Sequence, residues 1–206
     1  MSTNNKLYYV YDPMCSWCWG YKPVWQKISQ ALKDKIDIQY VVGGLAADLD
    51  QPMPEEMQRQ IASYWKKIED YLGTEFNYDF WSSNTPRRST YPSCRAVMAA
   101  RKQGAELPML SAIQSAYYLE ARNPSDNDVL IDLACKIGLE RAQFEADFFS
   151  PELNQQFMKE LEFARSIGGN SFPSLFVATD QGIVELQVDY QSAETTIDQV
   201  EQILSW

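Results

Sequence analysis

The spacing of apolar residues predicts strands near the start of the chain, with a helix between them. Residues 7–11 form a short run of aromatic and β-branched side chains, which is typical of a buried strand. Residues 36–42 follow the same pattern. Between them, apolar positions recur every three or four residues and predict a helix from Cys15 or Ser16 to about Lys33. A strand, helix and strand of these lengths favour a right-handed parallel crossover.

The middle of the chain, residues 52–150, shows helical periodicity without strand-like alternation. The spacing predicts helices over about 54–72, 92–104, 107–121, 127–137 and 140–149. The polar run 82–86 predicts a loop, and Asp126 stands where the N-cap of a helix is expected. We therefore predict that 52–150 is an all-helical insertion domain.

Strands return after residue 150. The pattern predicts a long helix over 151–167, a strand at the apolar end of 171–178, a turn at 179–182, a strand over 183–188 and a last helix over 193–204. The two strands should form a β-hairpin. The whole order, β-α-β, helical insertion, α-β-β-α, predicts an α/β fold with a mixed four-stranded sheet and helices on both faces. The sheet domain would comprise 1–51 and 151–206.

The candidate chemistry lies in Cys15-Ser16-Trp17-Cys18, between the first strand and the first helix. Two cysteines three residues apart on a first helical turn can form a short disulfide. Unpaired N–H groups and the helix dipole favour an anion at a helix N-terminus, and the thiolate is the reactive form of cysteine. We expect Cys15 to attack a partner and Cys18, one turn further in and more buried, to resolve the mixed disulfide.

Composition excludes several other kinds of chemistry. The 206 residues include four cysteines and no histidine, which excludes histidine-dependent triads and most catalytic zinc sites. A structural zinc site would need Cys94 and Cys135 to fold over the motif. We therefore expect neither a metal nor an organic cofactor.

Net charge and hydropathy indicate which partners and which cellular location to expect. The formal net charge of −10 argues against nucleic acid or an anionic membrane as partner. No run reaches the roughly 18 apolar residues of a membrane helix, and 7–11 is too short for a signal sequence. These features predict a cytoplasmic protein, and a signal removed before residue 1 stays an open alternative.

Other residues allow two readings each. Apolar neighbours at helical spacing predict that Cys94 and Cys135 are buried helical cysteines, and the alternative is a redox relay to Cys18. Arg87 and Arg88 are either a solvated pair or a contact for a carboxylate or glutathione.

The residues around the motif and Pro173 add four further expectations. Met14, Trp17 and Trp19 are expected to form an exposed apolar rim for unfolded substrate chains, unless Trp19 packs in the core and only Trp17 is exposed. Trp17 should report the redox state by its fluorescence. A carboxylate at Asp12 would oppose thiolate formation unless it points away. From the residues alone, Pro173 reads as a trans proline that begins a strand.

Residues 11–20, YDPMCSWCWG, resemble the DsbA-like branch of the thioredoxin superfamily, in particular its small members related to protein-disulfide isomerases. The resemblance continues through 116–120 (AYYLE) and 128–139, and closes with 164–177. It covers nearly the whole chain, and its first and last segments are the most specific.

The resemblance implies a thioredoxin fold interrupted by a helical domain, with Cys15 as nucleophile and Cys18 as resolving thiol. It also implies that Pro173 is a cis-proline facing the motif and that the Phe172 backbone binds an extended substrate chain. The expected partners are protein or peptide thiols and disulfides, with glutathione as a further candidate. The predicted substrate-binding residues are Met14, Ser16, Trp17, Phe172 and Pro173.

Two departures qualify this family expectation. Ser16-Trp17 replaces a histidine-containing pair, so the thiolate loses a charge-assisted hydrogen bond and the protein should be a weaker oxidant than the periplasmic enzymes. Phe172 is bulky for the residue before the proline.

The alternative functions are a glutathione-dependent, kappa-class-like transferase or isomerase on the same fold, and a holdase or adaptor that uses the apolar rim. The glutathione-dependent relatives commonly have serine at the position of Cys15. The oligomeric state stays open.

Overall fold

The computed structural model describes residues 5–205; the polar residues 1–4, on which part of the signal-sequence expectation falls, and Trp206 lie outside it. The strands are β1 (Lys6–Tyr11), β2 (Asp37–Val42), β3 (Ser174–Thr179) and β4 (Gly182–Leu186). The helices are α1 (Ser16–Leu32), α2 (Glu55–Leu72), α3 (Phe80–Ser83), α4 (Tyr91–Lys102), α5 (Glu106–Tyr118), α6 (Asn127–Lys136), α7 (Arg141–Phe148), α8 (Pro151–Ser166) and α9 (Glu194–Leu204). The predicted order of elements is confirmed.

The four strands form one mixed sheet in the order β2-β1-β3-β4. β1 and β2 are parallel, as the predicted crossover through α1 requires, and β3 is antiparallel to both β1 and β4. The register aligns Tyr11 with Val42 and Val10 with Ser174. The last residues of β1 and β2 and the first residue of β3 therefore lie side by side at one end of the strands. The β3–β4 hairpin is confirmed.

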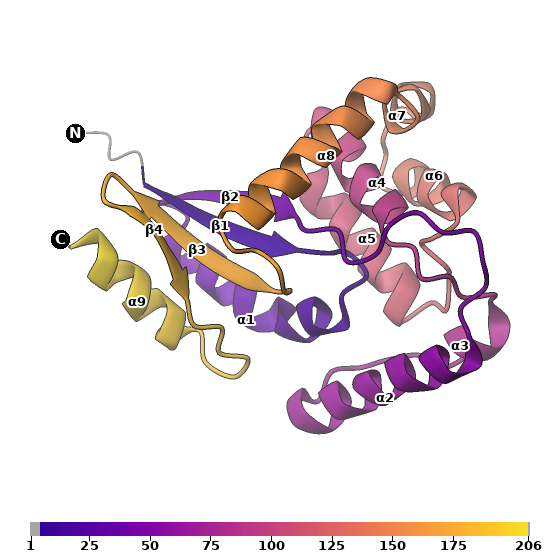
Figure 1. The fold of residues 1–206 in the computed structure, drawn as a ribbon, viewed down its shortest axis with the longest axis horizontal. Helices are drawn as coiled ribbons and strands as arrows, with labels where there is room; N and C mark the ends of the chain where they lie inside the picture. The colour runs from indigo at the N-terminus through magenta and orange to yellow at the C-terminus, as the bar shows by residue number, and fades with distance from the viewer. Residues whose placement is uncertain (1–4, 206) are drawn as a thin grey trace.

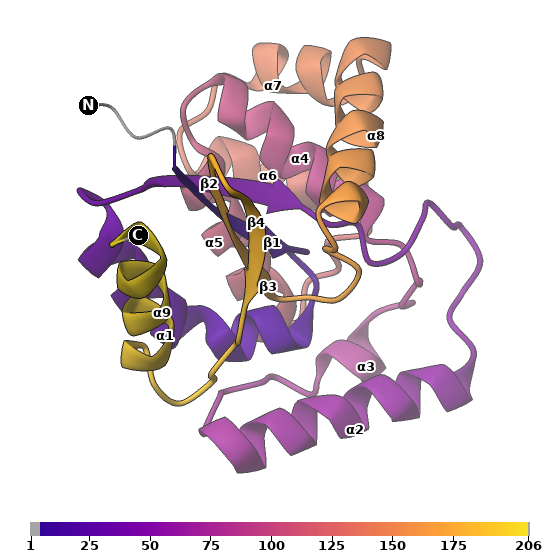
Figure 2. The same cartoon turned by 60° about the vertical axis from the view of Figure 1, so that its left-hand side comes forward.

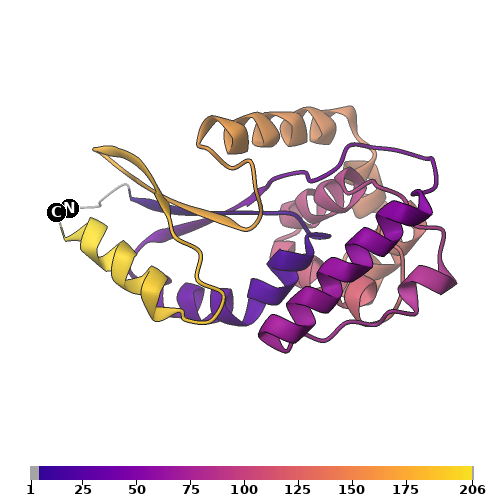
Figure 3. The same ribbon diagram turned by 60° about the horizontal axis from the view of Figure 1, so that its bottom comes forward.

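Helices cover both faces of the sheet, and most residues of its two inner strands are buried. α1 and α9 lie together on one face, and α8 lies on the other (Figures 1 and 3). The helices α2–α7 gather beyond the edge of the sheet at which β1 ends, with α2 and α3 on the side of α1 (Figure 2). This arrangement places the start of α1 between the sheet and the helical segment.

The helical segment shares its core with the sheet. The main buried cluster runs from Leu7 of β1 through Ile28 of α1 to Cys94, Ile113 and Phe144 of the helical segment. A second cluster, centred on Trp65, joins α2 to the start of α1 and to α5. The division of the chain into domains at residues 51/52 and 150/151 therefore stays a prediction.

The structure differs from the sequence expectations at several boundaries. Residues 80–83 form α3, although 82–86 was expected to be a loop, because Phe80 buries its ring against Trp65 and Tyr117 and draws the chain into a turn. α5 ends at Tyr118, and the chain reverses through Ala121 at φ 52°. Within residues 5–205, no helix combines the length and the apolar character that crossing a membrane would need.

Candidate functional site

Cys15 is the N-cap residue of α1. Its backbone is extended (φ −80°, ψ 115°), and its Sγ accepts a hydrogen bond from the Cys18 N–H at 3.4 Å. The first amides of a helix have no partner within the helix, so an acceptor at the N-cap satisfies one of them. Here the acceptor is a sulfur atom, and a thiolate accepts more strongly than a thiol. The start of α1 therefore places an N–H donor at the sulfur of Cys15.

Cys18 is buried completely, whereas Cys15 retains 6% exposure. Burial raises the pKa of the Cys18 thiol well above its ordinary value, and the neighbouring Cys15 raises it further. Both cysteines are free in this structure. Cys15 is thus the more accessible of the two sulfurs and Cys18 lies deeper, in the order of burial that the sequence predicts.

The segment before β3 lies against the motif. The Phe172–Pro173 peptide bond is cis, as the family resemblance implied. The Phe172 carbonyl oxygen accepts a hydrogen bond from Cys15 Sγ at 3.4 Å, although 157 residues separate the two. The Phe172 ring contacts Gly43, and the Arg165 guanidinium lies 5.5 Å from the ring centroid. The backbone of Phe172 is therefore placed at the reacting sulfur.

A cavity of about 500 Å³ opens in front of Cys15. It lies between the start of α1, one side of α2 and the segment 170–172. It is lined by Met14, Cys15, Ser16, Trp17, Leu45, Met57, Gln60, Ile61, Tyr64, Trp65, Arg88, Tyr117, Asn170, Ser171 and Phe172. Four of the five predicted substrate-binding residues thus surround one space, and the fifth, Pro173, adjoins it through its bond to Phe172.

The expected exposed rim is wrong for Met14, which is only 7% exposed. Met14 belongs to the buried cluster around Trp65, because α2 lies across the start of α1. Trp17 and Trp19 are both half-buried. The Trp19 indole N–H donates to the Glu75 carbonyl and its ring stacks on Tyr118, so it faces away from the cavity of Cys15.

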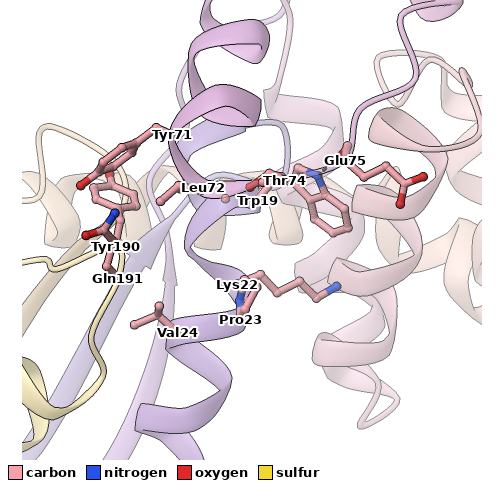
Figure 4. A pocket seen from close by; sticks show the side chains of 12 residues that line it. Trp19, Lys22, Pro23, Val24, Tyr71, Leu72, Thr74, Glu75, Tyr190 and Gln191 are labelled. Carbon is pink, nitrogen blue, oxygen red and sulfur yellow. Dashed lines mark hydrogen bonds between the residues drawn. The ribbon is translucent and has the colours of Figure 1, made fainter.

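Trp19 instead lines a second cavity, of about 600 Å³, between α1, the end of α2 and residues 190–191. Figure 4 shows that Lys22 extends beside Trp19, while Tyr71 and Tyr190 lie at the other end of the space. The Lys22 ammonium lies 5.0 Å from the Trp19 ring centroid and donates to Ser111. No sulfur-containing side chain lines this cavity, so it offers no thiol chemistry.

Asp12 is completely buried. After burial and the neighbouring Cys15, its negative charge is a further cause that raises the pKa of the Cys18 thiol. The Asp12 carboxylate accepts hydrogen bonds from the N–H groups of Met14 and Leu45, at 2.8 and 2.7 Å, and from Thr90 Oγ1 at 2.7 Å. Burial raises the pKa of this carboxyl, although the hydrogen bonds oppose the rise. Asp12 joins the motif to the segment after β2 and to the start of α4, and the sequence showed neither of these partners.

The remaining cysteines lie away from the cavity of Cys15. Cys94 is fully buried in α4, as predicted, and its Sγ is 3.5 Å from Asp12 Oδ2. Cys135 lies in α6, as predicted, but it is half-buried and not buried as expected. Among residues 5–205, no three histidine, cysteine, aspartate or glutamate side chains gather in an arrangement that could hold a metal ion.

The two neighbouring arginines of the sequence have different environments. Arg87 forms an ion pair with Asp126 and donates to the Ser125 carbonyl at 2.9 Å. Asp126 is the N-cap residue of α6, but its side chain makes no capping bond there. Arg88 lines the cavity in front of Cys15.

Comparison with known proteins identifies several similar chains. Residues 8–195 match a family model described as thioredoxin. A candidate protein disulfide isomerase from Nitrosomonas europaea has 26% identity and a TM-score of 0.85, and the match covers 98% of each chain. The cytosolic disulfide reductase DsbM from Pseudomonas aeruginosa has the same fold, with 24% identity and a TM-score of 0.79, over 98% of this chain and all of that one. DsbM is also known in a structure with glutathione.

Two curated relatives are ClpXP adapter proteins named SpxH. The one from Halalkalibacterium halodurans is 23% identical over 181 residues, and the one from Bacillus subtilis is 22% identical over 173 residues. These matches cover 85% and 82% of this chain. The chain spans less than three fifths of the length of these relatives, at 59% and 57%.

Proposed function

The chain belongs to the thioredoxin family, and from this membership we propose that it is a DsbA-like thiol–disulfide oxidoreductase in which Cys15 is the nucleophile and Cys18 the resolving thiol. One observation carries the proposal. The Sγ atom of Cys15 accepts the Cys18 N–H at a helix N-terminus and lies beside the Phe172 carbonyl, at the wall of a cavity that can admit a substrate. No other cysteine lines that cavity.

The proposed reaction begins with the protein in its dithiol form. The Cys15 thiolate attacks one sulfur of a substrate disulfide, the substrate S–S bond breaks, and the leaving sulfur takes the electron pair and a proton. Cys18 then loses its proton and attacks Cys15 Sγ. This second step releases the other substrate thiol and leaves a Cys15–Cys18 disulfide. Two electrons and two protons pass from the protein to the substrate, and an external thiol or dithiol restores the starting form.

The surroundings of Cys15 support a peptide substrate. The Phe172 carbonyl faces the reacting sulfur, so the same backbone segment can bind an extended chain in the manner of a strand addition. Ser16 and Trp17 would contact the substrate from the motif itself, with Met14 forming the floor. Protein or peptide thiols are therefore the proposed partners, and the structure of DsbM with glutathione supports glutathione as a further one.

The direction of net electron flow follows from the residues between the two cysteines. Ser16 and Trp17 carry no charge, so the Cys15 thiolate lacks the charge-assisted stabilisation that makes a strong oxidant. We expect a reductase or an isomerase, which suits a cytoplasmic location, and the disulfide reductase DsbM is described as cytosolic. A reduction potential as high as that of the strong periplasmic oxidants would contradict this assignment.

Insulin reduction with a thiol reductant tests the central assignment. We expect turnover by the wild type and its loss in Cys15→Ser. Cys135→Ser is a matched control, because Cys135 lies outside the cavity and should keep full activity. In Cys18→Ser, the mixed disulfide between Cys15 and the substrate should accumulate and be visible by mass spectrometry. Equal rates for the wild type and Cys15→Ser would refute the proposal.

A second candidate function is that of a protein adapter, which the similarity to the SpxH adapters favours. An adapter role predicts that a client is bound or protected even when both Cys15 and Cys18 are replaced by serine. The glutathione-dependent transferase alternative predicts activity that survives the loss of Cys18 alone. The oxidoreductase predicts loss of multiple turnover in both variants, so a single set of proteins separates the three functions.

A further inference from the structure

The cavity in front of Cys15 contains one side chain with a permanent charge. Arg88 is that residue; the other lining side chains, apart from the Cys15 thiol, are apolar, aromatic or neutral, such as Met57, Tyr64 and Gln60. The chain as a whole has a formal net charge of −10. The cavity wall is therefore positive on a protein whose overall field repels anions.

Arg88 also lacks a partner within the protein. Its neighbour Arg87 pairs with Asp126, and Arg95 of α4 forms two hydrogen bonds with the Asp48 carboxylate. Arg88 is half-buried, and among residues 5–205 no carboxylate, carbonyl or hydroxyl group pairs with its guanidinium. A guanidinium without a partner within the protein keeps all its donors free for an anionic ligand at the cavity wall.

We propose that Arg88 binds a carboxylate of the substrate, so that this protein prefers peptide disulfides with a carboxylate close to the reacting half-cystine. The inference rests on the proposed thiol–disulfide function and specifies its substrate class. A guanidinium offers a planar, bidentate pair of donors that matches a carboxylate. Because Arg88 and Cys15 line the same cavity, a substrate can contact the charge while its sulfur reaches Cys15.

The chemical step is the exchange already described. The Cys15 thiolate forms a bond to one substrate sulfur, the substrate S–S bond breaks, and Cys18 displaces the second substrate thiol. The pre-reduced protein supplies both electrons and both protons, so a single turnover needs no further reductant. Arg88 takes no part in the electron transfer and acts only on binding and orientation of the substrate.

A different role for Arg88 would be to stabilise the Cys15 thiolate. That role would change the rate equally for every substrate, whereas carboxylate binding changes it only for acidic substrates. Matched acidic and neutral peptides therefore separate the two roles. Arg59 provides the control for net charge, because it lies exposed on α2 and outside the cavity.

The experiment measures single-turnover reduction of short peptide disulfides by pre-reduced protein. One pair of peptides has blocked termini and differs only in Asp or Asn beside the cysteine. The other pair is neutral in its side chains and differs only in a C-terminal carboxylate or amide. Whichever pair discriminates identifies the source of the carboxylate. We expect the wild type to reduce an acidic member about tenfold faster than its neutral match, or about 1.4 kcal/mol.

Three variants complete the test. Arg88→Gln should lose the preference by slowing only the acidic peptide, Arg88→Lys should keep part of it, and Arg59→Gln should keep all of it. Equal rates for acidic and neutral members of both pairs in the wild type would overturn the carboxylate assignment. Equal fractional losses on both members in Arg88→Gln would overturn it as well. If the wild type reduces none of the peptides or insulin, the proposed function itself fails.

Discussion

Replacing Gly43 by alanine should disturb the site through a single steric contact. Gly43 follows β2 and lies buried against the Phe172 ring. A Cβ atom at position 43 would lie 1.9 Å from Phe172 Cε1, whereas ordinary contacts begin at 3.4 Å. The ring would have to retreat by about 1.5 Å. Its carbonyl is the group that accepts the hydrogen bond from Cys15 Sγ.

The size of the expected loss in stability depends on which atoms can move to relieve the clash. The clashing atoms are the far end of a half-buried ring, which favours the lower part of the range of about 1–3 kcal/mol for overpacking. The ring also lies 5.5 Å from the guanidinium of Arg165, which is held by the carbonyls of Gly43 and Gly169. We expect Gly43→Ala to lose about 1 kcal/mol of unfolding free energy, or about 2–4 °C in Tm. Displacing the Phe172 backbone, which we propose binds the substrate chain, would weaken one neutral hydrogen bond to the substrate. A loss of about 1 kcal/mol there would slow insulin reduction about fivefold.

Urea unfolding and insulin reduction would measure both effects, and a second substitution isolates their cause. Phe172→Ala keeps the carbonyl but removes the ring. In that background, Gly43→Ala should have almost no effect on unfolding or on rate. A Gly43→Ala protein with wild-type Tm and rate would refute the reasoning. An equal loss with and without the Phe172 ring would show that the contact is not its source.

Three other predictions concern the cysteines, the helical segment and the buried carboxylate. Iodoacetamide at neutral pH should modify Cys15 of the folded dithiol protein and leave Cys18 unmodified, because burial raises the pKa of Cys18. Mass spectrometry that finds Cys18 alkylated before Cys15 would contradict the assignment of Cys15 as the nucleophile. Trp65→Ala, at a fully buried position, should cost about 3–5 kcal/mol in urea unfolding, whereas Tyr71→Ala, 52% exposed on the same helix, should cost much less; similar losses would contradict the packing. Burial raises the pKa of Asp12 in the native state above 3.8, so its contribution to the unfolding free energy falls as the pH rises through that native pKa. Asp12→Asn should remove this dependence of the unfolding free energy on pH. The same pH dependence in the wild type and in Asp12→Asn would contradict the prediction.

The sequence by itself determined the elements and the reactive pair. Helical and strand periodicities depend on which face of each segment is apolar, so residues 7–11, 36–42 and the hairpin could be predicted without a structure. The spacing of Cys15 and Cys18 at a strand-to-helix junction was also local information. The same information placed Cys18 deeper than Cys15.

Only the tertiary structure decided what surrounds the pair. The contacts of Cys15 with Phe172, of Asp12 with Thr90 and of Gly43 with Phe172 join residues that are 157, 78 and 129 positions apart. No local sequence pattern predicts contacts between residues so far apart in the chain, because these contacts depend on how the sheet, α2 and α4 pack together. The same packing buried Met14 against the Trp65 cluster and left Arg88 at the cavity wall. An apolar or charged residue beside a motif can face solvent, core or substrate, and only the packed neighbours determine which.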